Sequence, residues 1–152
     1  MKTKTVPNPY SLPTAFRAYV YDAVVLAQET KRVNINTIGF NKHVLLSDCG
    51  INVLMVESLD EVELHDLCPW PEDDFFVFHK GKENGYTVLF KRLRDTFAHG
   101  HFESNSEDWI VIRHRYKGRG ERVENTRAFG HMQIGTLRKL VSFLDTANRD
   151  AI

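Results

Sequence analysis

The sequence of 152 residues contains only two cysteines, Cys49 and Cys68, and has no apolar run long enough to span a bilayer. Two cysteines do not make the disulfide framework on which small secreted domains depend. The first residues also lack the apolar segment of a secretory signal. We therefore expect a cytoplasmic protein with no membrane partner, in which both reduced thiols pack as small hydrophobic groups.

The chain also lacks net charge, since its 20 basic residues are balanced by 20 acidic ones. A general affinity for polyanions is therefore not expected. The charges are unevenly distributed, because residues 43–79 contain nine acids and no Lys or Arg, whereas residues 80–127 contain eleven Lys and Arg against seven acids. The second segment is locally basic, as an RNA site would require, although an ordinary dipolar surface explains the pattern equally well.

What the sequence does contain is an ordinary globular composition, with 42% hydrophobic and 26% charged residues. One domain covering residues 1–152 is the simplest organisation for this length. A fold of this size buries roughly 70% of the surface of the unfolded chain, so a sizeable core is expected. No internal repeat, low-complexity tract or linker divides the chain.

The most informative stretch is residues 86–102, where apolar residues recur at helical spacing. Gly100 follows as the expected helix stop, because glycine readily adopts the left-handed conformation that often ends a helix. The spacing predicts a helix anchored by one apolar stripe. The residues of this stripe are Tyr86, Leu89, Phe90, Leu93 and Phe97.

Charged and titratable residues occupy the other faces of the last two turns of this helix. An arginine carries a permanent positive charge and a histidine can move a proton near neutral pH, a pairing that suits chemistry on a phosphodiester. On an ideal helix, Asp95 and His99 are four residues apart and share a face with Arg92. Arg94 lies about 100° round from Asp95. The residues concerned are Arg92, Arg94, Asp95, His99 and, just after the helix, His101.

The segment Arg94–Gly100, which reads RDTFAHG, resembles the R-x4–6-H signature of the HEPN superfamily. In that family the arginine is typically followed by a polar residue, here Asp95, and the histidine often by glycine. The family is built on a small helical bundle that usually dimerises. Many members are metal-independent ribonucleases, found as toxins, in phage defence or in RNA processing. The predicted elements around the motif extend the resemblance, more loosely, to single-domain bacterial HEPN proteins.

The resemblance implies roles for the motif residues. His99 would be the general base toward a ribose 2′-hydroxyl or the general acid toward the leaving oxygen, and Arg94 would hold the scissile phosphate and stabilise its developing charge. Asp95 would orient His99 or Arg94. Arg92 also meets the spacing but lacks the following polar residue, so it is an auxiliary candidate. His101 is another, at a position where some members carry a tyrosine that accepts a nucleotidyl group from a partner antitoxin.

Metal and cofactor motifs are not recognisable. The pair His99-x-His101 and the pair His65-x-x-Cys68 have spacings found in metal sites, but neither belongs to a four-ligand set. Isolated polar or packed side chains are the simpler interpretation of both. We therefore expect no metal and no other cofactor.

The first half of the chain predicts further helices. One is expected from a start at Ser11 to about residue 30 and another over residues 47–57. Residues 33–35 could form a fragment of strand. A capping box formed by Ser58 and Glu61 predicts a short acidic helix that ends near Cys68, because prolines follow it.

Residues 75–78 are expected to add one more short helix. The alternative interpretation pairs residues 75–79 with residues 86–90 as a hairpin across the turn at 81–85. The apolar stripe that continues to Phe97 favours the helix. With these helices the predicted fold class is mainly α, an HEPN-like bundle with an added C-terminal β-hairpin and a final helix.

The clearest β-hairpin joins residues 109–116 to residues 122–129 across a Gly-containing turn. We place this extension at about 109–129 and the closing helix at about 132–147. The basic residues of the hairpin could cover RNA phosphates, although solvated strand faces explain them equally well. They are Arg113, Arg115, Lys117, Arg119, Arg122 and Arg127.

These observations predict a metal-independent RNA endonuclease of the bacterial toxin or phage-defence type. The expected state is a homodimer that brings two Arg94/His99 pairs to one groove, with a cognate antitoxin as a further candidate partner. The first alternative is a non-catalytic HEPN module that binds RNA, nucleotide or a protein. The second is an interaction protein in which the motif is only structural.

Overall fold

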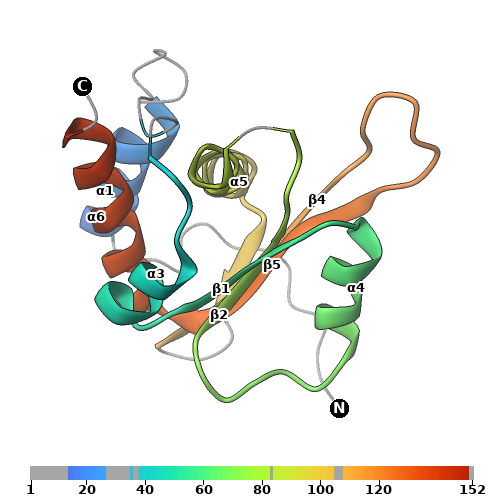
Figure 1. Cartoon of the computed structure of the whole chain (residues 1–152), viewed down its shortest axis with the longest axis horizontal. Coiled ribbons are helices and arrows are strands. Elements are labelled where there is room, and N and C mark those ends of the chain that lie inside the picture. The colour runs from blue at the N-terminus through green and yellow to red at the C-terminus, as the bar shows by residue number, and fades with distance from the viewer. Residues whose placement is uncertain (1–13, 27–34, 36–37, 83, 105–107, 151–152) are drawn as a thin grey trace.

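Five strands and the helices that flank them make up the computed structural model, which describes residues 14–26, 35, 38–82, 84–104 and 108–150 (Figure 1). The strands are β1 (Asn52–Val56), β2 (Phe75–His79), β3 (Phe102–Ser104), β4 (Trp109–Tyr116) and β5 (Asn125–Gln133). The helices are α1 (Thr14–Val20), the π-helix η2 (Tyr21–Leu26), α3 (Lys42–Cys49), α4 (Leu59–Leu67), α5 (Gly85–His99) and α6 (Ile134–Asp150).

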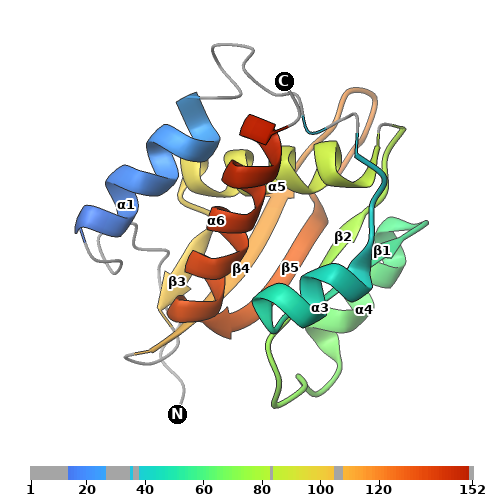
Figure 2. The same ribbon diagram turned by 60° about the vertical axis from the view of Figure 1, so that its left-hand side comes forward.

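The strands form one mixed sheet in the order β1-β2-β5-β4-β3. β1 and β2 are parallel and are connected through α4, whereas the remaining neighbours pair antiparallel. α4 covers one face of the sheet, and α1, α3, α5 and α6 lie over the other (Figures 1 and 2). The expected mainly α, HEPN-like helical bundle is therefore wrong, and the chain is a mixed α/β protein.

The error comes from two short apolar segments that have packed side chains on both faces, partly buried in β1 and fully buried in most of β2. β1 lies where we predicted a helix over residues 47–57, and β2 lies where we predicted one over residues 75–78. In β2, Phe76 and Phe78 enter the main core while Phe75 and Val77 pack beneath α4. A strand buried on both faces shows no alternation of apolar and polar residues, so a short apolar run does not distinguish it from a buried helix.

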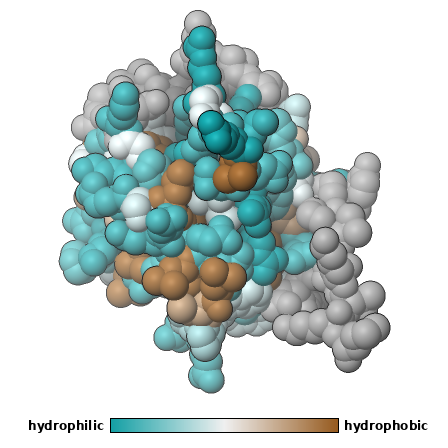
Figure 3. Space-filling model, turned by 90° about the vertical axis from the view of Figure 1, so that its right-hand side faces the viewer, coloured by the Kyte–Doolittle hydropathy of each residue, from teal (hydrophilic) through white to brown (hydrophobic). Residues whose placement is uncertain are grey.

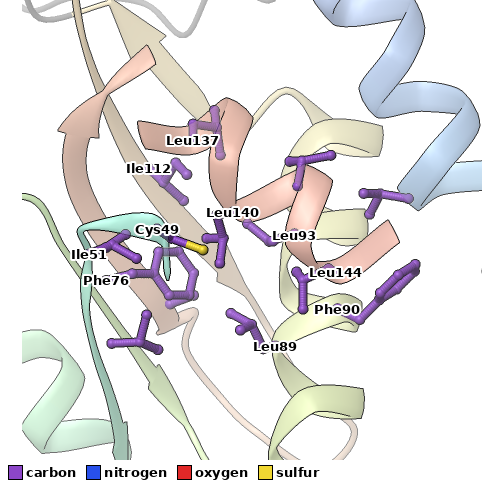
Figure 4. Packing of buried hydrophobic residues seen from close by; sticks show 14 of the residues in the cluster. Cys49, Ile51, Phe76, Leu89, Phe90, Leu93, Ile112, Leu137, Leu140 and Leu144 are labelled. Atoms are coloured by element: carbon purple, nitrogen blue, oxygen red, sulfur yellow. The ribbon is translucent and has the colours of Figure 1, made fainter. Parts of the chain in front are cut away.

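The main core lies between the sheet and helices α5 and α6. Leu89 and Leu93 of α5 pack there with Leu140 of α6, against Phe76 and Ile112 of the sheet (Figure 4). Each such side chain contributes about 1.5–3 kcal/mol of burial free energy. The predicted stripe is confirmed, because four of its five residues are buried and Phe97 packs against the same cluster.

Capping contacts lie at the ends of α5 and α4, and they confirm the stop predicted at Gly100 and the start predicted at Ser58. The Asn84 side chain accepts a hydrogen bond from the Tyr86 N–H at the start of α5. At its end Gly100 adopts φ 66°, and its N–H donates to the Thr96 carbonyl. The Ser58 hydroxyl accepts from the Glu61 N–H at 3.2 Å and begins α4, which ends at Leu67 as expected.

The predicted hairpin is confirmed as β4 and β5, although β5 begins at Asn125 and continues to Gln133. The closing helix is also confirmed, as α6. A bulge interrupts the hairpin, because His114 pairs with Ala128 while Arg115 pairs with Thr126. Arg127 is thus the extra residue on β5. β3 was not predicted.

The predicted N-terminal helix is confirmed over the described residues 14–26, of which the last six are π-helical; its continuation to residue 30 lies outside the described residues. The predicted strand fragment at 33–35 also falls mainly outside them, and Ile35 is buried without belonging to a strand. Cys49 is buried as expected. The expectation that Cys68 is packed is wrong, because its side chain is exposed.

The surface on the side of α4 is mainly hydrophilic, and a hydrophobic patch lies in the lower half of this view (Figure 3). α4 lies on this side and carries Leu64 and Leu67, which are 58% and 75% exposed. None of the helices in the described part of the chain combines the length and the apolar character needed to cross a membrane.

Candidate active site

A pocket of about 460 Å³ opens where the end of α5 meets the distal half of β4. Most of the residues singled out from the motif contribute to it, together with residues of the hairpin. Its walls therefore come from segments that are separate in the sequence. The lining residues are Arg94, Asp95, His99, His101, His114, Arg115, Tyr116, Lys117 and Glu124.

The turn after α5 and the alternation of β4 bring the histidines together. The His101 N–H donates to the Thr96 carbonyl at 2.9 Å, and the His101 carbonyl accepts from the Arg113 N–H at 3.1 Å. These two bonds fix His101 beside β4. Along β4, Ile110 and Ile112 point into the main core, so His114 lies on the same face two residues later.

Arg94 and Asp95 form an ion pair within the pocket, with Arg94 Nη1 2.6 Å from Asp95 Oδ1. Asp95 is only 13% exposed and Arg94 28%. The second carboxylate oxygen of Asp95 lies 3.7 Å from His114 Nε2. Asp95 therefore faces the guanidinium of Arg94 and the imidazole of His114 at once.

Three imidazoles follow one another from the surface into the protein. His99 is exposed, His101 is half-buried and His114 is 2% exposed. The His99 and His101 ring centroids are 5.7 Å apart, and those of His101 and His114 are 5.2 Å apart. His101 Nδ1 and His114 Nδ1 lie 2.9 Å apart, which is a hydrogen bond between the two rings.

Burial controls the charge of the two inner histidines. It lowers the pKa of His114 to about 4, and the opposing attraction of Asp95 is the smaller effect. Burial also lowers the pKa of His101, and the charge of His99 adds to this effect. Burial thus favours the neutral form of both rings, and the hydrogen bond between the two Nδ1 atoms requires that at least the accepting ring be neutral.

Arg92 lies apart from the pocket lining. Its side chain is 6% exposed, and its charge lowers the pKa of both His79 and His114. The Thr96 hydroxyl donates to its carbonyl. Of the three residues expected to share one helix face, Asp95 and His99 line the pocket and Arg92 does not.

The basic residues of the hairpin are divided between several places. Arg115 and Lys117 line the pocket, whereas Arg119 is exposed outside its lining. Arg113 lies outside the pocket lining and forms ion pairs with Asp66 at 3.0 Å and with Glu103 at 3.1 Å.

The bulge residue Arg127 contacts an aromatic ring and a carboxylate of the hairpin. Its guanidinium lies 4.3 Å from the centroid of the Tyr116 ring and pairs with Glu121. A cation in this position is attracted by the face of the ring. The contact holds Tyr116, whose ring centroid is 5.2 Å from that of His114, at the edge of the pocket.

His114, Tyr116 and Glu124 line the pocket but were not predicted as site residues. For His114 and Tyr116 a signal existed, because Ile110, Ile112, His114 and Tyr116 alternate along one face of the predicted strand. A histidine in line with two core isoleucines indicates a buried imidazole. No comparable local pattern marks Glu124.

Among the residues that the structure describes, no group of three or more His, Cys, Asp or Glu side chains is arranged to hold a metal ion. Comparison with family models, curated proteins and solved structures finds no match for this chain. The chemistry of the pocket therefore rests on its own geometry and on the motif.

Proposed function

We propose that the protein is a metal-independent RNA endonuclease that uses Arg94 and His99 on the scissile phosphate. The observation that carries the proposal is the gathering of two arginines and three imidazoles in the lining of a single pocket. A guanidinium can stabilise the negative charge that develops on a phosphate, and an imidazole can transfer a proton near neutral pH. Cleavage of a phosphodiester without a metal ion can use both kinds of group.

In the proposed reaction the ribose 2′-oxygen attacks the adjacent phosphorus, and its proton passes to a histidine acting as general base. The bond between phosphorus and the 5′-oxygen breaks, and that oxygen receives a proton from a histidine acting as general acid. Arg94 neutralises the charge on the non-bridging oxygens. The products are a 2′,3′-cyclic phosphate and a 5′-hydroxyl. His99 fills one of the two proton-transfer roles.

The charge around the pocket supports a polyanionic substrate. Arg115 and Lys117 stand on the hairpin side of the pocket, opposite Arg94 on α5. Cations on two walls can contact successive phosphates of one strand. Asp95 and Glu124 reduce the net positive charge, so binding should depend on salt less steeply than it would for an entirely basic groove.

The second candidate function is RNA binding without cleavage. The ion pair between Arg94 and Asp95 favours it, because a guanidinium already held by a carboxylate has fewer N–H groups to offer a phosphate. Binding of a labelled RNA by the purified protein, with no cleavage under any buffer condition, would support this candidate.

We further propose that the protein is a homodimer, in which two Arg94/His99 pairs share one groove. Residues 75–78 are buried in the sheet, so their apolar side chains are not available to a dimer interface, which must use another surface. A toxin or phage-defence role, with a cognate antitoxin as regulator, belongs to the same proposal.

The decisive test is cleavage of a labelled RNA by wild type, Arg94→Ala and His99→Ala. Loss of a charge-stabilising or proton-transfer group should slow cleavage by roughly a hundredfold or more. Because His99 is exposed and the Arg94 pair is partly solvated, each change should cost only about 1 kcal/mol of stability or less.

Arg92→Ala is a poor control for this test, because Arg92 is buried and its loss could disturb the fold. Lys139→Ala is better, since Lys139 is exposed on α6 and lies outside the pocket lining. Circular dichroism and thermal melts would establish that each variant is folded. Folded Arg94→Ala and His99→Ala proteins that cut RNA as fast as wild type would falsify the catalytic assignment.

A further inference from the structure

The hydrogen bond between His101 and His114 determines which nitrogens carry hydrogen. The two Nδ1 atoms are 2.9 Å apart, so one ring donates and the other accepts. The deciding partner is Asp95, whose Oδ2 lies 3.7 Å from His114 Nε2. At that distance Asp95 acts as a nearby charge rather than a direct acceptor, and a carboxylate attracts an N–H and repels a nitrogen lone pair.

The contacts among Asp95, His114 and His101 determine which ring nitrogens of the two histidines carry hydrogen. With hydrogen on His114 Nε2, the Nδ1 atom of neutral His114 has only a lone pair and must accept. His101 Nδ1 then carries the hydrogen and donates it. His101 Nε2, on the other side of a ring that lines the pocket, is left with a free lone pair. Within the described part of the chain the His101 ring makes its hydrogen bond through Nδ1 and none through Nε2.

We infer that His114 is a positioning residue that holds His101 as the general base of the proposed cleavage, so the inference rests on the proposed function of this pocket. Asp95 orients His114, His114 fixes the tautomer and ring plane of His101, and His101 Nε2 faces the substrate. The same logic, in which an acceptor orients one imidazole for proton transfer, operates in other hydrolases through a carboxylate.

The electrostatics of the two rings agree with this order. Burial lowers the pKa of His114 to about 4, so His114 does not become an imidazolium that would lose its acceptor at Nδ1. The pKa of His101 is lowered by burial and by His99, so His101 is unprotonated at neutral pH, as a base must be.

The assignment divides the two proton transfers between different histidines. His101 Nε2 takes the proton from the 2′-hydroxyl as the new bond from oxygen to phosphorus forms. His99, in protonated form, gives a proton to the departing 5′-oxygen as the bond from phosphorus to that oxygen breaks. His99 suits this role, because it is exposed in the last turn of α5, where the negative end of the helix dipole attracts a positive charge.

The first test reads the tautomers directly and needs no activity. Long-range proton–nitrogen NMR spectra of histidine-labelled protein at pH 7.5 should show His101 protonated at Nδ1 and His114 at Nε2. In His114→Phe, which keeps a ring in the site but removes both nitrogens, His101 should lose this fixed tautomer. His131→Phe is the matched control, because His131 is a half-buried strand histidine outside the pocket lining, and it should leave His101 unchanged.

The second test is kinetic. His114→Phe should lower kcat for RNA by about tenfold or more and leave KM close to wild type, because a misoriented base affects the chemical step. His114→Asn returns an oxygen acceptor near the Nδ1 position and should recover much of the rate and the Nδ1–H signal of His101. A purely structural role for His114 would not produce rescue of both readouts.

The outcomes separate this inference from the proposed function. Wild-type His101 protonated at Nε2, or spectra and kcat unchanged in His114→Phe, would overturn the positioning role even if the protein cuts RNA. A wild-type protein that does not cut RNA would overturn the proposed function and the general-base role together. The NMR result would then still decide whether His114 fixes the His101 tautomer.

Discussion

The substitution His114→Phe should change how the stability of the protein depends on pH. Burial lowers the pKa of His114 from its ordinary 6.5 to about 4. Between pH 6.5 and pH 4, His114 is therefore protonated in the unfolded chain and neutral in the folded protein. Stability from this group is therefore fully present above pH 6.5 and is lost as the pH falls toward 4. At about 1.36 kcal/mol for each pKa unit, the whole loss is about 3 kcal/mol, and about 2 kcal/mol of it occurs by pH 5.

Urea unfolding at pH 7.5 and pH 5.0 measures this contribution. Wild type should lose about 2 kcal/mol more than His114→Phe between the two conditions. Groups that do not contact His114 keep their own titrations in both proteins, so the difference reports His114 together with its hydrogen-bonded partner His101. Equal losses in the two proteins would refute the claim that His114 is buried and neutral. The charged and titratable groups that act on His114 are Arg92, Asp95 and His99 of α5, and His101 before β3.

Three further outcomes are expected. RNA cleavage should survive EDTA and leave a 2′,3′-cyclic phosphate or its hydrolysis product; activity abolished by EDTA and restored by magnesium would point to another mechanism. Gly130→Ala should destabilise the protein by about 1–3 kcal/mol in urea, because an added Cβ would lie 2.6 Å from the Phe76 ring, whereas Gly135→Ala meets nothing within 4 Å and should not. Light scattering at micromolar protein should give twice the chain mass of 17.6 kDa, and a persistent monomer at high concentration would count against a shared site.

The predictions from sequence succeeded where one side of an element faces water. α5 shows its apolar stripe because its other faces are polar, and Ser58, Asn84 and Gly100 act through local contacts. β1 and β2 failed for the opposite reason. Both strands are covered on their two faces, and pairing between distant segments, rather than local preference, makes them strands.

The candidate site was likewise predictable from the sequence only in part. Arg94, Asp95, His99 and His101 lie within eight consecutive residues, so their proximity follows from one helix end and one turn. The position of His114 depends on how β4 pairs with β3 and β5, which local sequence does not determine. The alternation that places His114 on the core face was visible, but the segment that it would meet was not.

The hairpin beyond the bulge at Arg127 has a consequence for how a long polymer could enter the pocket. β2 pairs with β5 only at residues 128–131 and β3 pairs with β4 only at residues 110–112, so beyond the bulge the hairpin is a two-stranded ribbon that projects from the sheet (Figure 1). An isolated pair of strands is only marginally stable. The wall that carries Tyr116 and Lys117 therefore depends on its own strand pairing and on two side-chain contacts, of Thr126 with Glu63 and of Arg127 with Tyr116, while α5 and its motif are fixed in the core. An outward movement of this ribbon would open the pocket from the side, so a strand of RNA, the substrate proposed above, would need no free end to enter.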